Sequence, residues 1–201
     1  MGGSESYASG INNAGQVVGE AQTSNGTRHA TIWNGTTPTD LGTLGGNSSS
    51  ALAINNVGQV VGNAKTSGGT FHATIWNGTT PTDLGTLGGN YSEGTAINDS
   101  GQVVGWASNL SESHHAVIWN GTTMIDLNDF LSVGEVSAGL VLQGAYGIND
   151  SGWIVGGGTH GAFLLVPIPV AAVPEPETYA MFMAGLGLMG FIARRRKNGQ
   201  A

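Results

Sequence analysis

The chain has 201 residues, which is enough for one or two ordinary domains with a buried core. It contains 35 glycines and no cysteine, and its charged residues make up only 9%, against about 25% in ordinary proteins. This composition excludes a disulfide framework, a thiolate zinc site and a cysteine nucleophile, and it speaks against a coiled coil or a helical bundle. We therefore expect an all-β protein.

The charges are distributed unevenly along the chain. All 13 acidic residues precede residue 178, where Arg28 and Lys65 are the only Lys or Arg residues. The other four basic residues are consecutive, namely Arg194, Arg195, Arg196 and Lys197. Because the acidic part would repel a phosphate backbone, we expect no nucleic-acid partner.

From residue 6 onward the sequence repeats with a period of 43 residues. The segment Gly-Gln-Val-Val-Gly begins at positions 15, 58 and 101, and a His-Ala-x-Ile-Trp segment begins at positions 29, 72 and 115. A diverged fourth copy covers 152–156 and 160–165. Three full copies and one partial copy therefore fill residues 6–166, which we interpret as one β-repeat domain over 1–166.

Each copy carries the signals of four short strands joined by tight turns. In the second copy, strands are predicted at 51–54, 59–61, 71–76 and 82–87. The turn between the first two strands contains Asn55 and Gly58, and Asn77-Gly78 is a strong hairpin dipeptide. Four strands in about 40 to 45 residues are typical of a β-propeller blade, so we predict a β-propeller-like body, with a β-solenoid as the alternative.

The number of copies does not suit a closed propeller, which typically has about four to eight blades. We therefore expect the chain to be the C-terminal part of a longer protein or to start late, with a ring built from several chains as the alternative. Residues 1–25 also contain no apolar run of the about 7 to 15 residues that a secretory signal peptide needs. A truncated N-terminus would explain both features.

The C-terminal part differs in composition from the repeats. Residues 167–177 are Pro-rich and are predicted to form a stiff linker, and residues 178–201 contain a sixteen-residue uncharged apolar run followed by the basic residues. As a helix this run would span about 24 Å, and interfacial flanks could extend it across a membrane. We predict one transmembrane helix over 178–193, in contact with lipid, with Arg194–Lys197 as a cytoplasmic stop.

Two resemblances cover most of the chain. Pro174, Glu175 and Pro176, followed by the apolar run and the basic residues, resemble the PEP-CTERM sorting signal of Gram-negative bacteria, in which Pro-Glu-Pro is recognised by exosortase, a membrane-embedded transpeptidase-like enzyme. The 43-residue unit resembles the extracellular HAF repeat. Together these resemblances imply an exported protein that is anchored in the membrane, sorted by exosortase, and associated with the cell surface or with exopolysaccharide.

The repeated polar residues do not suggest catalysis. Four histidines occupy equivalent positions (His29, His72, His115 and His160), but the sequence supplies no evident carboxylate partner for a metal-binding histidine, so we expect no metal and no cofactor. The repeated acids Asp40, Asp83 and Asp126 are copies of one position and not a catalytic pair, so their expected role is hydrogen bonding at turns and strand ends. His114, which the other copies lack, is expected in solvent.

The repeat tryptophans Trp33, Trp76 and Trp119 allow two interpretations. An in-register tryptophan at a strand end favours a place in the core, whereas an exposed row of rings would favour contact with a glycan. We expect a non-enzymatic exported repeat protein, with a carbohydrate-binding module that uses these tryptophans as the first alternative. A non-catalytic fragment of a larger extracellular hydrolase is the second alternative.

Overall fold

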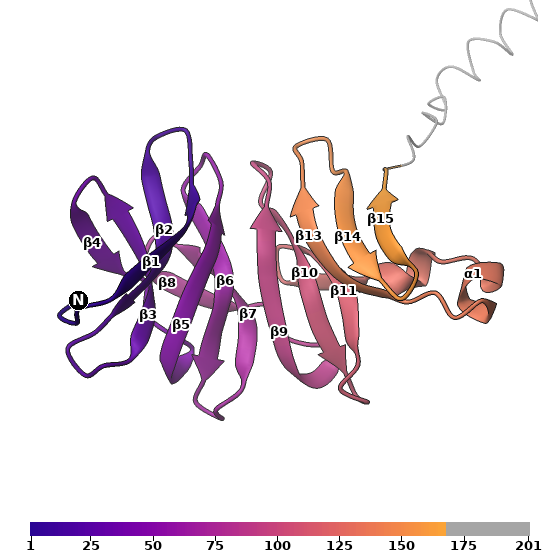
Figure 1. The fold of residues 1–201 in the computed structure, drawn as a ribbon, viewed down its shortest axis with the longest axis horizontal. Coiled ribbons are helices and arrows are strands. Elements are labelled where there is room, and N and C mark those ends of the chain that lie inside the picture. The colour runs from indigo at the N-terminus through magenta and orange to yellow at the C-terminus, as the bar shows by residue number, and fades with distance from the viewer. Residues whose placement is uncertain (168–201) are drawn as a thin grey trace, which may run out of the picture. The chain divides into compact units, whose positions relative to one another are not determined.

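The computed structural model of the protein describes residues 1–167, which form four small antiparallel sheets (Figure 1). Sheet 1 contains β1 (Ser6–Ile11), β2 (Gln16–Gln22), β3 (Arg28–Asn34) and β4 (Thr37–Asp40). Sheet 2 contains β5 (Gly45–Ile54), β6 (Gln59–Thr66), β7 (Phe71–Asn77) and β8 (Thr80–Asp83). Sheet 3 contains β9 (Gly88–Ile97), β10 (Gln102–Asn109), β11 (His114–Asn120) and β12 (Thr123–Asp126), and sheet 4 contains β13 (Leu142–Ile148), β14 (Ile154–Gly158) and β15 (Gly161–Leu165). The all-β prediction is confirmed.

Each sheet is a simple meander, and its first hairpin has the predicted turn. The side-chain oxygen of Asn55 accepts a hydrogen bond from the backbone N–H of Gln59 at 2.8 Å, and the N–H of Gly58 donates to the carbonyl of Asn55 at 3.1 Å. Gly58 has φ = 84°, a conformation that a residue with a Cβ rarely adopts. The same arrangement of an asparagine and a glycine recurs in the other sheets.

The fourth strand of the repeat is shorter than predicted. In the second copy β8 ends at Asp83, whose carboxylate accepts a hydrogen bond from the N–H of Gly85 at 2.8 Å and so turns the chain out of the sheet. Leu84 then enters the core between sheets 2 and 3, where it is 3% exposed. Residues 82–87 therefore do not form the one continuous strand that was predicted from the sequence.

The hydrophobic core consists of three layers, one between each pair of neighbouring sheets. We call the side of a sheet that faces the preceding sheet its front face, and the opposite side its back face. In sheet 2 the front face carries Val60 and Trp76, which pack against Val18 of sheet 1, and the back face carries Val61, which packs against Val103 of sheet 3. The adjacent valines of the repeat thus point to opposite faces, as the period of a strand requires.

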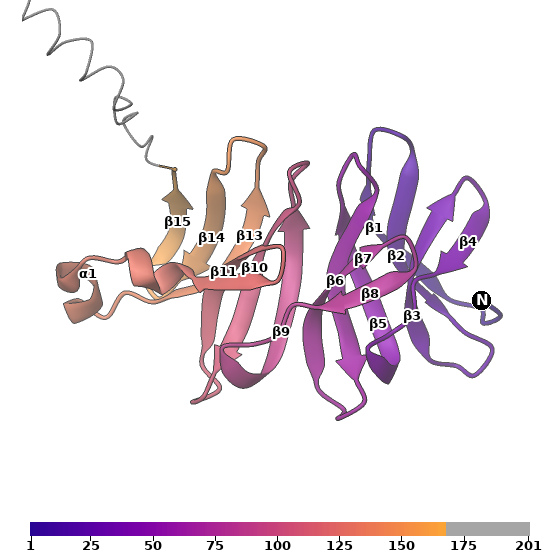
Figure 2. The same cartoon turned by 180° about the vertical axis from the view of Figure 1, so that it is seen from behind.

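The sheets follow one another in chain order, and sheets 1 and 4 lie at opposite ends of the row (Figures 1 and 2). Within residues 1–167 they close neither a barrel nor a propeller ring. No described strand of one sheet belongs to the hydrogen-bonded ladder of another, which differs from the continuous parallel sheets of a β-solenoid. The blade-like units predicted from the repeat are present, whereas the closed arrangement is not.

An insertion separates sheets 3 and 4. It contains a 3-10 helix, η1 (Leu127–Phe130), and a short helix, α1 (Val133–Ser137). The side chains of Ser132 and Glu135 cap α1 reciprocally. Within residues 1–167 no helix has the length and apolar content needed to cross a membrane. The predicted helix over 178–193 and residues 168–177 of the predicted linker lie outside the described residues.

Candidate functional site

The repeat histidines form a recurring pair with the repeat aspartates. Nδ1 of His29 lies 2.9 Å from the carboxylate of Asp40, and Nδ1 of His72 lies 2.9 Å from that of Asp83. His115 and Asp126 make the same contact. Each pair joins the start of the third strand of a sheet to the end of the fourth, so the expected strand-end role of the aspartates is confirmed.

These pairs correct the expectation that the repeat histidines lack a carboxylate partner. The partner was missed because it lies eleven positions further along the chain, on the other strand of a hairpin. His160 differs from the other three, since its Nδ1 lies 3.3 Å from Oγ1 of Thr159. Among residues 1–167, no three His, Asp or Glu side chains come close enough to hold a metal ion.

The repeat tryptophans lie mainly between the sheets. Trp76 and Trp119 are both 0% exposed, and Nε1 of Trp119 donates a hydrogen bond to the carbonyl of Leu84 at 2.8 Å. Trp33 is half-buried on the front face of sheet 1, where no sheet precedes it within the described residues. Two of the three rings can therefore offer no surface to a glycan.

A different tryptophan lines a groove with a volume of about 760 Å³. Trp106 of β10 stacks on His114 of β11, with ring centroids 4.1 Å apart and an angle of 20° between the planes. Trp106 lies opposite Ala116 in the sheet, and His114 is two residues from Ala116, so the two rings are diagonal neighbours on one face. The expectation that His114 is exposed is confirmed, but its ring is part of an aromatic platform.

Tyr146 of β13 supplies a further ring to this groove and is 63% exposed. Its ring lies over the backbone of two glycines of sheet 4, because a Cβ on Gly144 would meet it at 2.9 Å and a Cβ on Gly157 at 3.3 Å. Gly144 and Gly157 thus leave room for the Tyr146 ring against sheet 4. Gln143 and Glu112 add polar side chains to its walls.

Trp106 also lines a second groove, of about 370 Å³, whose walls come from sheets 1, 2 and 3. Tyr91 and Phe71 contribute aromatic rings there, and Asn63 donates a hydrogen bond to the carboxylate of Glu93. The two grooves meet at the Trp106 side chain. Aromatic rings with a few polar groups around them are typical of sites for small neutral ligands.

Sequence reasoning missed this site because it compared what the copies share. At the position of Trp106 the first two copies have Glu20 and Asn63, and at the position of His114 they have Arg28 and Phe71. The useful signal was therefore the difference between copies. An aromatic residue that replaces a polar one at a single repeat position marks a site that only one sheet carries.

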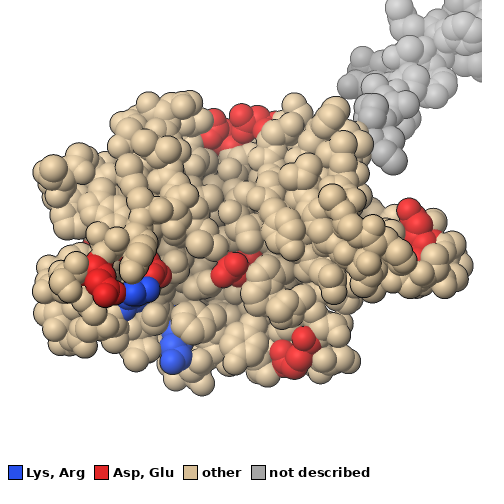
Figure 3. Space-filling view, viewed as in Figure 1, with Lys and Arg blue, Asp and Glu red and all other residues tan. Residues whose placement is uncertain are grey.

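The face of residues 1–167 seen in Figure 3 has few positive charges. Arg28 binds the carboxylates of Glu5 at 2.7 Å and Glu20 at 2.9 Å, and the hydrogen bond to Glu5 is the main cause that raises the pKa of Arg28. Lys65 lies 5.9 Å from the centroid of the Phe71 ring. The other charged side chains of residues 1–167, which we call the body, are acidic. The body therefore disfavours anionic ligands.

Comparison with known families adds a finding at the other end of the chain. Residues 172–197 match the PEP-CTERM protein-sorting motif. The PEP-CTERM match supports sorting of an exported protein to the cell envelope, with exosortase as the processing partner. No curated protein and no solved structure matches the chain. Pro174, Glu175 and Pro176, like Arg194, Arg195, Arg196 and Lys197, lie outside the described residues.

Proposed function

We propose that the chain is a non-enzymatic protein of the bacterial surface, whose repeated sheets are the cargo of its PEP-CTERM tail. The match of residues 172–197 to the sorting motif carries this proposal. Exosortase would recognise Pro174, Glu175 and Pro176 while residues 178–193 are held in the membrane and Arg194–Lys197 remain on the cytoplasmic side. Cleavage would then pass the body to the cell surface or the exopolysaccharide matrix.

The body supports a cargo role through its composition and its order. Its sheets are copies of one unit, with a core layer between each pair of neighbours. Repeated units that pack only on their neighbours form extended scaffolds, and their equivalent residues recur because every unit has the same structural need. The likeness of the 43-residue unit to the extracellular HAF repeat fits the same role.

The sorting step is tested with the full chain, fused to a secretory signal peptide, in hosts with and without exosortase. We expect the mass of the segment after the Pro-Glu-Pro motif to be lost only in the host with the enzyme. Pro174→Ala combined with Glu175→Ala should abolish this loss. The matched control is Pro167→Ala with Pro169→Ala, which changes two prolines of the same stretch outside the motif and should be processed normally.

An intact chain that stays in the membrane fraction of both hosts would overturn the processing mechanism. The tail would then be a permanent anchor. Processing that survives the change of Pro174 and Glu175 would instead show that the enzyme reads another part of the tail.

We also propose that the body binds a neutral polysaccharide in the groove at Trp106. The observation that favours this second function is the platform of Trp106 and His114, with Tyr146 exposed on the adjacent sheet. Aromatic rings pack against the apolar faces of sugars, and Gln143 in the groove wall would bind hydroxyl groups, whereas both carboxylate oxygens of Glu112 already accept hydrogen bonds from Asn90. The tryptophans Trp33, Trp76 and Trp119 are not needed for this mode of binding.

The groove is tested by titrating the protein with cellohexaose and maltohexaose, and with an oligogalacturonate as the anionic comparison. We expect at least one neutral oligosaccharide to bind and Trp106→Ala to weaken this binding about tenfold or more. Trp153→Ala is the matched control, because Trp153 is 47% exposed and lies outside the groove. Equal affinity of the Trp106 and Trp153 variants, or preference for the anionic probe, would overturn this function.

A further inference from the structure

The two ends of the row of sheets expose faces that are covered everywhere else. On the front face of sheet 1, Ile11 is 68% exposed, whereas the equivalent Ile54 and Ile97 are each 9% exposed. On the back face of sheet 4, Val155 is 48% exposed, whereas the equivalent Val104 is 0% exposed. Each end face is therefore a copy of a surface that packs against another sheet inside the molecule.

The two end faces are complementary to each other. Every core layer joins the back face of one sheet to the front face of the next. The uncovered back face at the end with sheet 4 carries Val155 and its cross-strand partner Leu164, which is 52% exposed. The uncovered front face at the end with sheet 1 carries Ile11, Val17 and Trp33. The internal interfaces thus provide a template for bringing these two faces together.

Hydrogen bonds between the first-hairpin turns of successive sheets form a row that runs from sheet 1 to sheet 4. Like the sheet faces, this row is open at both ends. The side-chain amide of Asn12 donates to the carbonyl of Asn55 at 3.2 Å, that of Asn55 to Asn98 at 3.0 Å, and that of Asn98 to Asn149 at 3.1 Å. Within residues 1–167 the amide of Asn149 has no such acceptor, and the carbonyl of Asn12 has no such donor.

A second row runs beside the first and ends in the same way. The backbone N–H of Asn13 donates to Oδ1 of Asn56 at 3.0 Å, Asn56 to Asp99 at 2.8 Å, and Asp99 to Asp150 at 2.9 Å. If the row continued into another molecule, the backbone N–H of Asp150 would donate to the side-chain oxygen of that molecule's Asn13. Both rows therefore point to a partner whose first sheet has the turn of Asn12 and Asn13.

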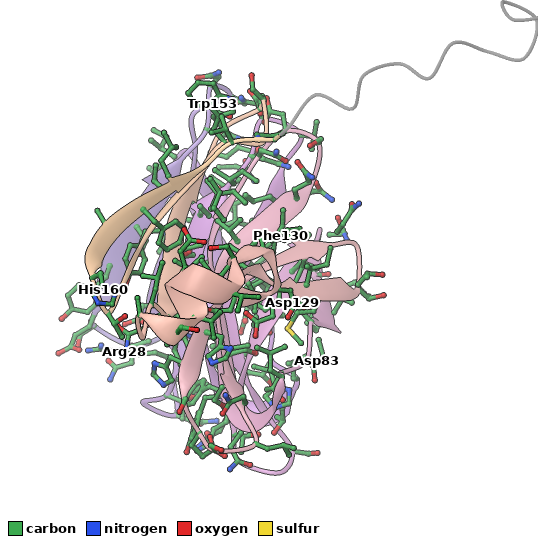
Figure 4. The ribbon with its side chains drawn as sticks, turned by 90° about the vertical axis from the view of Figure 1, so that its right-hand side faces the viewer. Arg28, Asp83, Asp129, Phe130, Trp153 and His160 are labelled. Carbon is green, nitrogen blue, oxygen red and sulfur yellow. The ribbon has the colours of Figure 1, made fainter. Side chains whose placement is uncertain are left out.

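We propose that two copies of this chain dock head to tail, with the back face of sheet 4 of one copy on the front face of sheet 1 of the other. Figure 4 shows the end that would be covered, with Trp153 at one edge and His160 at another. Residues 1–167 of two copies, joined at both ends, contain eight sheets, which is within the usual range of about four to eight for a closed ring of blades. Such a contact is heterologous, and it stops growing when the ring closes.

The insertion between sheets 3 and 4 supports this choice of occupant. It reaches beyond β15 at the same end of the row (Figures 1 and 2), and it carries Phe130, Val133 and Val136, which are 65%, 84% and 58% exposed. The chain after β15 is a poorer occupant, because residues 167–177 are rich in proline, which lacks the N–H that a sheet ladder needs. A second copy provides a folded sheet of the correct pattern.

The docking is tested by cysteine crosslinking. Because the sequence contains no cysteine, only the introduced cysteines can react. In the full chain, solubilised in detergent, Asn13→Cys with Asp150→Cys should be joined between copies by a short bifunctional maleimide and should run at twice the mass on a denaturing gel. Asn56→Cys with Asp99→Cys is the positive control, because these positions are neighbours within one chain and should crosslink without a doubling of mass. Asn13→Cys with Ser24→Cys is the control for random collisions.

Charges on the end faces provide the matching test of assembly. By sedimentation in detergent we expect a dimer, and we expect Ile11→Asp or Val155→Asp to weaken it about tenfold or more, since a buried unpaired charge opposes association. Leu110→Asp is the control, because Leu110 is 86% exposed in the β10–β11 turn, away from both end faces.

A monomeric full chain would overturn the proposal, as would a dimer that both end-face variants leave intact, since such a dimer would form through the tail. If Asn13→Cys and Asp150→Cys instead crosslink the chain into an open series of larger oligomers, the head-to-tail contact is supported. The closed ring of two copies would then be overturned. None of these outcomes depends on exosortase or on an oligosaccharide.

Discussion

Asp99 illustrates how one residue connects two sheets. The side-chain amide of Asn56 donates to its carboxylate at 2.9 Å and the backbone N–H of Asn56 donates at 2.8 Å, and these bonds, the side-chain one first, lower the pKa of Asp99 from its ordinary 3.8. A carboxyl group with a lower pKa in the folded state stabilises that state above its unfolded pKa. This contribution is lost as the pH falls through the folded pKa.

We therefore expect Asp99→Asn to make the free energy of unfolding less dependent on pH in the range below about pH 5. Urea unfolding at a series of pH values measures this slope. Asn56→Ala, which removes the side-chain donor and leaves the carboxyl group in place, should reduce the slope in the same direction. If both variants keep the slope of the unmodified chain, the pair does not contribute to acid sensitivity.

Gly62 shows why the repeat needs glycine in the middle of a strand. A Cβ at this position would lie 2.0 Å from the carbonyl oxygen of Ser50 on the neighbouring strand, which is too close for any side chain. We expect Gly62→Ala to lower the free energy of unfolding by about 1–3 kcal/mol, as overpacking does in other cores. Gly68→Ala is the control, because the nearest atom to its Cβ is Oγ1 of Thr66 at 3.6 Å. Urea unfolding that shows equal effects of the two changes would contradict this explanation.

At the level of elements, the burial of the tryptophan on the third strand shows whether the front face of its sheet is covered by another sheet. Trp119 is wholly buried and hydrogen-bonded to the carbonyl of Leu84, whereas Trp33 occupies the same position in sheet 1 and is only half-buried. In dilute solution, where the copies are separate, we expect Trp119→Ala to cost about 3–5 kcal/mol and Trp33→Ala clearly less, because less packing is lost at the end of the row. Thermal and urea unfolding of the two variants measure the difference. Equal losses would mean that Trp33 is covered in solution.

Much of the element structure could be predicted, because the repeat shows the same strand and turn signals three times. The hairpin turn at Asn55 and the all-β class followed from turn chemistry and composition. The end of β8 could not be predicted, because Asp83 turns the chain through a hydrogen bond that a strand pattern does not reveal. The Trp106 groove was missed because Trp106 and His114 differ from the residues at the same positions of the other copies, and because Tyr146 joins them from β13 only when sheets 3 and 4 pack.

At the level of the whole described part, residues 1–167 have no single core, and their stability comes from contacts between neighbouring sheets. Sheets 2 and 3 are packed on both faces, whereas sheets 1 and 4 have one exposed face each within residues 1–167. Local opening should therefore begin at the two ends, and amide hydrogens of β6 and β10 should exchange about tenfold or more slowly than those of β2 and β14. Hydrogen exchange followed by mass spectrometry measures this order, and uniform protection in dilute solution would contradict it.

The same measurement connects the end faces with assembly. If copies dock head to tail, β2 and β14 gain a second packed face, so their exchange should slow as the protein concentration rises, because binding stabilises the docked state by mass action. The rates of β6 and β10 should change much less, since these strands are already covered on both sides. Val155→Asp should remove the dependence on concentration at both ends of the row, because the back face of one copy is the partner of the front face of the next. A gain confined to one end would contradict a head-to-tail contact and would indicate a partner that covers one face alone.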